Sequence, residues 1–264
     1  MTSSLPYANN IPLPGFFNLR DGGDLPTPNG KVRADRLLRS DEPSSLNEQA
    51  LTFLKGLPLN LVIDLRTEQE IEMSQDPFAE SGFKVDTIPV FSGSVQSMMG
   101  KASSLEALYV EMIDGSAAAL ASAVGAVSDG VQDGAVIVHC TAGKDRTGVV
   151  IALTQSLLGV PEQEIVDNYS ATQANLNAAW FQETMKAYAT KMGMTPDKIQ
   201  AMVAKTGVPL ADLEKIATSS PASAMQGVLK HLDTKYGGAK KYLLSNGLPQ
   251  AKIDALVSAL LVAN

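Results

Sequence analysis

The sequence has a single cysteine, Cys140, and few aromatic residues, which occupy 5% of its 264 positions. One cysteine excludes an intrachain disulfide, so the thiol belongs to a reducing compartment or is kept for chemistry. No uninterrupted apolar run approaches the roughly 18 residues that suggest a membrane span. The first ten residues are polar and lack a basic start followed by an apolar stretch, so no secretory signal is predicted. We expect a cytoplasmic protein and leave export without a classical signal open.

The chain also lacks an excess of positive charge. Lysine and arginine number 21 against 28 aspartates and glutamates, which gives a net charge of −7. A broad nucleic-acid-binding face is therefore not expected, and any anionic ligand must be held by a local pocket. Apolar residues make up 45% and charged residues 19%, which is typical of a soluble globular protein with a sizeable core. We expect one domain over residues 1–264 and a monomer.

Predicted strands alternate with predicted helices. Residues 60–65, 84–90 and 135–139 are predicted strands, and the last is continuously apolar, as in a parallel strand covered on both faces. The first 30 residues are rich in proline and glycine and are predicted to be loop. The pattern predicts an α/β fold with a central, mainly parallel sheet flanked by helices and a helical C-terminal elaboration. Helices are predicted over residues 45–55, 105–128, 146–158, 161–172, 175–192, 195–205, 210–217, 223–235, 240–245 and 249–261.

The most informative segment, His139–Gly148, lies between the last predicted strand and the following helix. The chain reverses within five residues, and Gly143 relieves the steric limits of doing so. Successive backbone N–H groups in such a turn can point into a common hollow, to which the helix adds its unpaired N–H groups and positive dipole end. The backbone of residues 141–146 is therefore predicted to form an anion cradle.

Cys140 opens this cradle and Arg146 closes it. A thiol that faces converging N–H groups, a helix N-terminus and a guanidinium is expected to ionise near neutrality and act as a nucleophile. Arg146 offers a planar fork that grips two phosphate oxygens. These parts match in-line phosphoryl transfer to sulfur, with the loop holding the equatorial oxygens. The predicted substrate-binding residues are Thr141, Ala142, Gly143, Lys144, Asp145, Arg146 and Thr147, whose hydroxyl is expected near the sulfur.

The leaving oxygen needs a proton, for which Asp145 is the first candidate because it lies inside the loop. It would protonate the leaving group and then, as a carboxylate, activate the water that cleaves the phosphocysteine. Asp86 and Asp114 remain alternatives. Lys144 adds positive charge at the rim, which would favour multiply phosphorylated or lipid headgroup substrates.

Cysteine, five residues and then Arg-Thr-Gly is the signature of the protein-tyrosine phosphatase superfamily. The fuller string 139–148 resembles the atypical tyrosine phosphatases of bacteria and fungi, a group that acts on phosphotyrosine, phosphoserine/threonine and phosphoinositides. Segments 18–23, 38–40 and 62–66 resemble that family's N-terminal blocks, and residues 236–248 resemble its C-terminal helical block. The resemblance implies a phosphocysteine intermediate, no metal or other cofactor, and roles for Asp145 and Lys144 in acid chemistry and substrate choice. Some members carry a helical lid, for which residues 174–220 are the candidate.

The leading prediction is a metal-independent phosphatase of phosphotyrosine proteins, with phosphoserine/threonine and phosphoinositides as further substrates. A dedicated phosphoinositide or inositol-phosphate phosphatase is the rival enzyme, and a non-catalytic phosphate-binding module is the rival from another class. Arsenate reduction is disfavoured because that chemistry typically recruits further cysteines.

Four neighbouring side chains carry a weaker signal. Lys31, Arg33, Arg36 and Arg39 form either a solvated face or a positive rim that steers phosphate to the site. His139 is expected to brace the loop by hydrogen bonding rather than to transfer protons.

Overall fold

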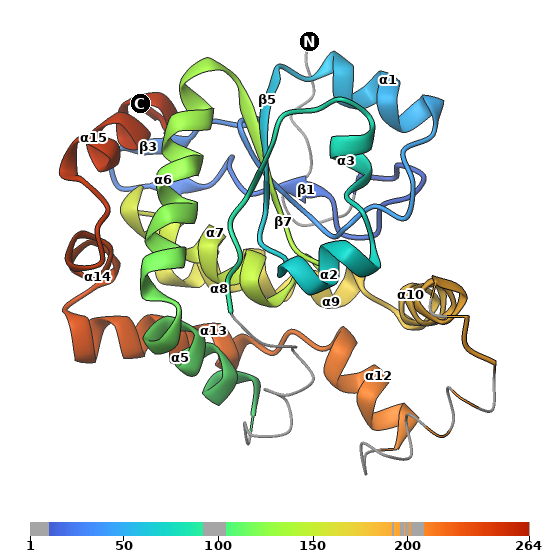
Figure 1. The fold of residues 1–264 in the computed structure, drawn as a ribbon. Coiled ribbons are helices and arrows are strands. Elements are labelled where there is room, and N and C mark those ends of the chain that lie inside the picture. Colours follow the sequence, from blue (N-terminus) through green and yellow to red (C-terminus); the bar gives the residue numbers. More distant parts are fainter. Residues whose placement is uncertain are drawn as a thin grey trace.

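A five-stranded sheet forms the centre of the protein (Figure 1). The structure, a computed structural model, describes residues 11–91, 104–191, 193–195, 198, 201 and 209–263. Four strands run parallel and one edge strand is antiparallel to its neighbour, which confirms the predicted fold class of a mainly parallel sheet flanked by helices. In spatial order the strands are β1 (Arg20–Asp21), β4 (Leu37–Ser40), β7 (Ala135–His139), β5 (Leu59–Asp64) and β6 (Val85–Thr87).

The sheet separates two hydrophobic cores, because successive side chains of a strand point to opposite faces. Val62 and Ile137 pack on the face covered by α1 (Glu48–Gly56) and α3 (Pro77–Glu80). Their neighbours along β5 and β7 pack on the other face, against α6 (Ala117–Asp133) and α7 (Asp145–Leu157); these neighbours are Leu61, Ile63, Val136 and Val138. Every residue of β7 is buried, as its continuously apolar sequence predicts.

The long stretch predicted around residues 105–128 is helical, but it is interrupted by a bend and extends further than predicted. Two helices occupy this stretch, α5 (Leu105–Gly115) and α6, and they are bent by 84° at Ser116. Gly115 and Ser116 at the junction both have low helix propensity, so interrupting the helix there costs little free energy. No single helix in the described ranges is long and apolar enough to cross a membrane; α5 and α6 pass that test only as this bent pair.

Several short strands were not predicted. Two of them, β1 and β4, belong to the central sheet. The other three form a second, antiparallel sheet, which consists of β2 (Pro26–Thr27), β3 (Gly30–Val32) and β8 (Leu261–Ala263). Strands of two to four residues are too short for a recognisable alternation. Close pairing at β8 also depends on Gly30, where a Cβ would lie 2.0 Å from the carbonyl oxygen of Val262.

The C-terminal half is helical, as predicted. The helix predicted over residues 195–205 lies mostly outside the described residues, as does part of the candidate lid at 174–220. In Figure 1, α10 (Ala178–Lys191) lies to the right of α2 (Glu68–Met73) and α9 (Thr172–Asn175), and α12 (Leu210–Thr218) lies below them. The helices that the structure describes after α7 are α8 (Glu162–Ser170), α9 (Thr172–Asn175), α10 (Ala178–Lys191), α12 (Leu210–Thr218), α13 (Ala222–His231), the π-helical η1 (Leu232–Tyr236), α14 (Ala239–Ser245) and α15 (Gln250–Leu260).

Candidate active site

The predicted cradle begins where β7 ends, in the middle of the sheet. His139 is in register with Ser40 of β4 on one side and Asp64 of β5 on the other. The loop therefore leaves at the carboxyl edge of three parallel strands, where open α/β sheets bind ligands. Cys140 follows directly and is 2% exposed. Five residues later α7 begins at Asp145, close to its predicted start at Arg146.

The loop carbonyls are bound from outside the loop. The amide of Glu42 donates to the Thr141 oxygen at 3.1 Å. The side chain of Asn18 donates to the oxygens of Ala142 and Gly143, both at 3.1 Å, and Arg39 donates to the Gly143 oxygen at 2.8 Å. In a trans peptide the N–H points opposite to the C=O of the same unit. The amides of residues 142–144 therefore point away from these partners, as an anion cradle requires.

Gly143 is required where the loop passes β4. Its φ is +62°, a conformation that costs a side-chain-bearing residue free energy. A Cβ there would lie 2.2 Å from the carbonyl oxygen of Ser40 and 2.5 Å from the amide nitrogen of Asp41. Only glycine allows the turn to pack this closely against the sheet.

Arg146 is held by a glutamate that the sequence did not single out. Its Nη1 and Nη2 atoms each donate to one carboxylate oxygen of Glu70, both at 2.7 Å. Glu70 is fixed in turn by the capping box that starts α2, where it accepts from the amide and hydroxyl of Thr67, both at 2.9 Å. Thr141 of the loop also donates to Glu70 at 2.8 Å. The guanidinium of Arg146 is thus oriented before any substrate arrives.

These contacts change the acidity of Glu70 and Arg146. Burial would raise the pKa of Glu70, but its hydrogen bonds and attraction to Arg146 lower it to about 2. Burial would lower the pKa of Arg146, and Glu70, Cys140 and Asp145 together raise it above the ordinary arginine value. Both side chains are therefore charged at neutral pH.

Arg39 is a second cation beside the cysteine. It is fully buried under the loop, where burial lowers its pKa to about 10 while attraction to Cys140 opposes the shift. It still carries its charge at neutral pH. The hydroxyl of Thr147 is also buried, and it makes no hydrogen bond to the sulfur or to any other described residue.

The structure distinguishes among the three candidate acids. Asp145 stands at the first position of α7 and accepts a hydrogen bond of 2.5 Å from the hydroxyl of Tyr109. Asp114, at the end of α5, instead binds three side chains of the C-terminal helices: His231, Lys235 and Tyr236. Asp86 lies on edge strand β6, and no hydrogen bond joins it to the loop within the described residues. Only Asp145 is in the cradle.

Lys144 does not stand at an exposed rim as predicted. It is 1% exposed, and its Nζ donates to the carbonyl oxygens of Ile216 at 2.8 Å and Ala217 at 3.1 Å. These oxygens are at the C-terminal end of α12, where unpaired carbonyls and the negative helix dipole end favour a cation. The same Nζ lies 3.5 Å from Asp145 Oδ1. Lys144 therefore connects the cradle to the candidate lid.

Of the two alternatives for the cations of residues 31–39, a solvated face or a positive rim, the rim does not form. Its four cations are dispersed: Arg39 lies under the loop, and the other three bind groups that do not belong to the cradle. Their partners are Asp24 for Lys31, the Ala259 carbonyl for Arg33, and the Gly134 and Val131 carbonyls for Arg36.

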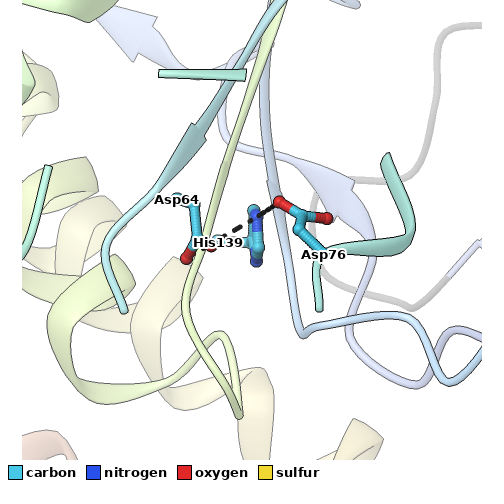
Figure 2. A group of neighbouring side chains, drawn as sticks. All are labelled: Asp64, Asp76 and His139. Atoms are coloured by element: carbon cyan, nitrogen blue, oxygen red, sulfur yellow. Dashed lines mark ion pairs between the residues drawn. The ribbon is translucent and has the colours of Figure 1, made fainter. Parts of the chain in front are cut away.

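A buried ion cluster lies beneath the cysteine. Figure 2 shows Asp64 and Asp76 on either side of the His139 ring, whose Nε2 is 3.9 Å and 3.3 Å from their respective oxygens. Burial would lower the pKa of His139, but the two carboxylates together raise it. Arg66 binds both oxygens of Asp64 at 2.8–3.1 Å. Arg66 also pairs with Glu42 at 2.9 Å. Asp64, Asp76 and His139 have a spacing that could hold a metal ion, and Arg66 supplies a positive charge beside two of the three carboxylates of this cluster.

Sequence reasoning missed the residues that support the loop. Thr67 and Glu70 have the spacing of a capping box, which signals a helix start but not a partner 76 residues away. Asn18 and Arg39 belong to segments that resemble the family, yet no pattern indicated that they bind the loop carbonyls. Tyr109 carried no signal at all beyond helical periodicity.

A buried parallel strand ends next to a cysteine, and the cysteine starts a turn whose carbonyls are bound from outside. An arginine that Glu70 holds in place follows the turn. This arrangement is that of a phosphatase with a cysteine loop. The chain belongs to the tyrosine phosphatase family, since the sequence model of that family matches residues 11–262. The predicted family is thereby confirmed.

Two relatives span most of the chain. The tyrosine-protein phosphatase of Nostoc commune is 30% identical over 231 residues, which cover 85% of this chain and 74% of the relative. The triple specificity protein phosphatase PtpB of Mycobacterium tuberculosis is 25% identical over 283 residues, covering 94% and 98%. Among solved structures, P. aeruginosa TpbA covers 67% of this chain and 98% of its own, with 18% identity and a TM-score of 0.33. The family assignment rests on the sequence matches.

Proposed function

We propose that this phosphatase hydrolyses phosphotyrosine in proteins through a covalent intermediate on Cys140. The observation that carries this proposal is the orientation of the loop, whose carbonyls are bound from outside, so that the amides of residues 142–144 point to the opposite side. Phosphate oxygens bound there would place phosphorus next to the sulfur. The thiolate then attacks phosphorus in line while the ester oxygen leaves, and the equatorial oxygens stay bound by the amides and Arg146.

Arg146 can bind phosphate without releasing Glu70. A guanidinium has five N–H donors in a planar fork. Glu70 uses the edge formed by Nη1 and Nη2. At the edge formed by Nε and Nη2, Nη2 makes only a long contact of 3.5 Å with the Thr141 hydroxyl, so this edge can grip two oxygens of the transferred group. Glu70 therefore orients the clamp rather than blocking it.

Asp145 is the general acid and base in this proposal. In the first step it gives its proton to the leaving oxygen as the P–O bond breaks. In the second step its carboxylate takes a proton from water, whose oxygen attacks phosphorus and releases the sulfur. Of the three candidate carboxylates, it is the one that belongs to the loop. No metal or other cofactor is needed for either step.

Phosphoserine/threonine proteins and phosphoinositides are the further substrates that we propose, with a dedicated phosphoinositide phosphatase as the rival. The relatives bear on this choice by name: one is called a tyrosine-protein phosphatase and another a triple specificity protein phosphatase. Recognition of a second phosphate by Lys144 would require its Nζ to leave the two carbonyls of α12. This cost favours phosphotyrosine as the leading substrate.

Substrate turnover by the parent protein and a Cys140→Ser variant tests the proposal. The parent should release phosphate from a phosphotyrosine peptide, and the variant should bind that peptide but release none. A phosphoinositide in detergent micelles is assayed in parallel. Turnover of the lipid alone would establish the rival enzyme, and binding without turnover by the parent protein would establish a phosphate-binding module.

A further inference from the structure

Two buried tyrosines stand behind the proposed acid. Tyr109 of α5 and Tyr169 of α8 are 0% and 1% exposed, and their hydroxyl oxygens are 2.8 Å apart. Their rings meet edge to face, with centroids 5.9 Å apart. Tyr109 also contacts Oδ1 of Asp145 at 2.5 Å. A chain of three hydrogen-bonding groups therefore runs from the core to the cradle.

The direction of this chain is fixed by the acidity of its members. Burial, together with the negative charge of Asp145, raises the pKa of Tyr109 well above the ordinary value and that of Tyr169 as well. Both phenols therefore keep their protons throughout the working pH range. Tyr109 has one O–H, which it donates to Asp145, so Tyr169 must donate to the oxygen of Tyr109.

The two oxygens of Asp145 are consequently not equivalent. Oδ1 accepts from Tyr109 and lies 3.5 Å from the ammonium group of Lys144. Oδ2 makes no hydrogen bond with any residue that the structure describes, and the side chain is 20% exposed. Arg39 and Arg146 also attract the carboxylate, but neither hydrogen-bonds to it. The oxygen available for proton transfer is Oδ2.

We propose that Tyr109, supported by Tyr169, is a positioning residue that fixes Asp145 so that Oδ2 carries the proton exchanged with substrate. This inference rests on the proposed role of Asp145 as general acid and base. In the first step the proton passes from Oδ2 to the leaving oxygen, which keeps the electron pair of the broken P–O bond. The carboxylate left behind is then stabilised by the O–H of Tyr109, and it accepts a proton from water in the second step. A hydrogen bond to the charged form favours that form.

The test compares aryl phosphates whose leaving groups differ in basicity. p-Nitrophenolate leaves with little help from an acid, whereas phenolate needs a proton. Tyr109→Phe should lower kcat/KM for phenyl phosphate by about 10-fold or more and that for p-nitrophenyl phosphate by no more than about 3-fold, since general acid catalysis typically contributes 10²–10⁴-fold. The basic limb of the pH–rate profile for phenyl phosphate should move to higher pH.

Tyr242→Phe is the matched control, because Tyr242 is also fully buried and donates only to the carbonyl oxygen of Ile113, at 2.7 Å. Tyr242→Phe should change kcat/KM for the two aryl phosphates by the same factor and leave the basic limb of the pH–rate profile where it is. If Tyr109→Phe folds poorly, Tyr169→Phe removes only the outer donor and should show the same selectivity with a smaller effect.

Asp145→Asn separates the two ways in which the reasoning can fail. A variant that loses the same factor on both substrates overturns the acid role of Asp145, and the positioning role with it. If Asp145→Asn loses much more kcat/KM for phenyl phosphate than for p-nitrophenyl phosphate, but Tyr109→Phe and Tyr169→Phe show no such difference, the positioning role alone is overturned. Equal losses on both substrates in the tyrosine variants also overturn it, because they indicate a structural effect.

Discussion

Replacing Glu70 by glutamine should impair catalysis although Glu70 does not touch the substrate in our proposal. Glutamine preserves the shape and one carbonyl oxygen, but its amide nitrogen would face a donor nitrogen of Arg146. The guanidinium then loses one of its two bonds at 2.7 Å and its fixed orientation. The amide nitrogen of glutamine would also face either the Thr141 hydroxyl or the amide and hydroxyl of Thr67. The hydrogen bond from the backbone amide of residue 70 to the Thr67 hydroxyl, which caps α2, remains.

The size of the effect follows from the acidity of Glu70. Its pKa falls from an ordinary 4.5 to about 2, which corresponds to roughly 3 kcal/mol of interaction with the charged carboxylate. The side chain is 22% exposed, so solvent screening reduces the usable part to about 2 kcal/mol. If this energy maintains the phosphate-binding orientation of Arg146, kcat/KM should fall by about 30-fold, because 1.4 kcal/mol is about tenfold.

The assay measures kcat/KM for p-nitrophenyl phosphate together with inhibition by inorganic phosphate. Both should weaken in parallel, since Arg146 holds the same oxygens in each case. Glu72→Gln is the control, because Glu72 is exposed on the same helix and should leave both values unchanged. Tighter phosphate binding in Glu70→Gln would refute the reasoning, because it would mean that Glu70 competes with phosphate for the guanidinium. Unchanged values would refute it as well.

Three further outcomes are expected. The unfolding free energy should decrease as pH falls from about 4.5 towards 2. The lowered pKa of Glu70 stabilises the fold above the unfolded-state pKa, and this contribution is lost when Glu70 is protonated. In denaturant titrations, the unfolding free energy of Glu70→Gln should decrease less over this pH range than that of the parent protein. Gly143→Ala should abolish turnover and lower Tm in a thermal melt by more than Gly159→Ala does. Both glycines have positive φ, but only a Cβ at position 143 would meet backbone atoms within 2.5 Å. Gly159→Ala should therefore lower the unfolding free energy only by about 1 kcal/mol of backbone strain. Lys144→Met should accelerate hydrogen–deuterium exchange in α12, because two bonds to its last carbonyls are lost; unchanged exchange there would contradict the contact.

Local patterns were sufficient for the frame of the molecule. The continuously apolar β7 and the apolar β5 were predicted as strands, and the regular helices after α7 were predicted close to their observed ends. Periodicity failed where the elements are short or bent, as at β4 and at the break after α5. Such elements depend on what they pair with or pack against, and a single sequence does not record that.

The cradle itself could be predicted from ten consecutive residues, because a turn, its glycine and the start of a helix are local features. Its electrostatic environment was decided only in the tertiary structure. Glu70 and Tyr109 meet residues 76 and 36 positions further along the chain, and Arg39 meets a carbonyl 104 positions away. The position of Lys144 against α12 depends on the fold in the same way. Contacts between distant segments depend on how strands and helices stack in space. The sequence could therefore point to the proposed nucleophile, but only the folded chain revealed which residues orient the groups around it.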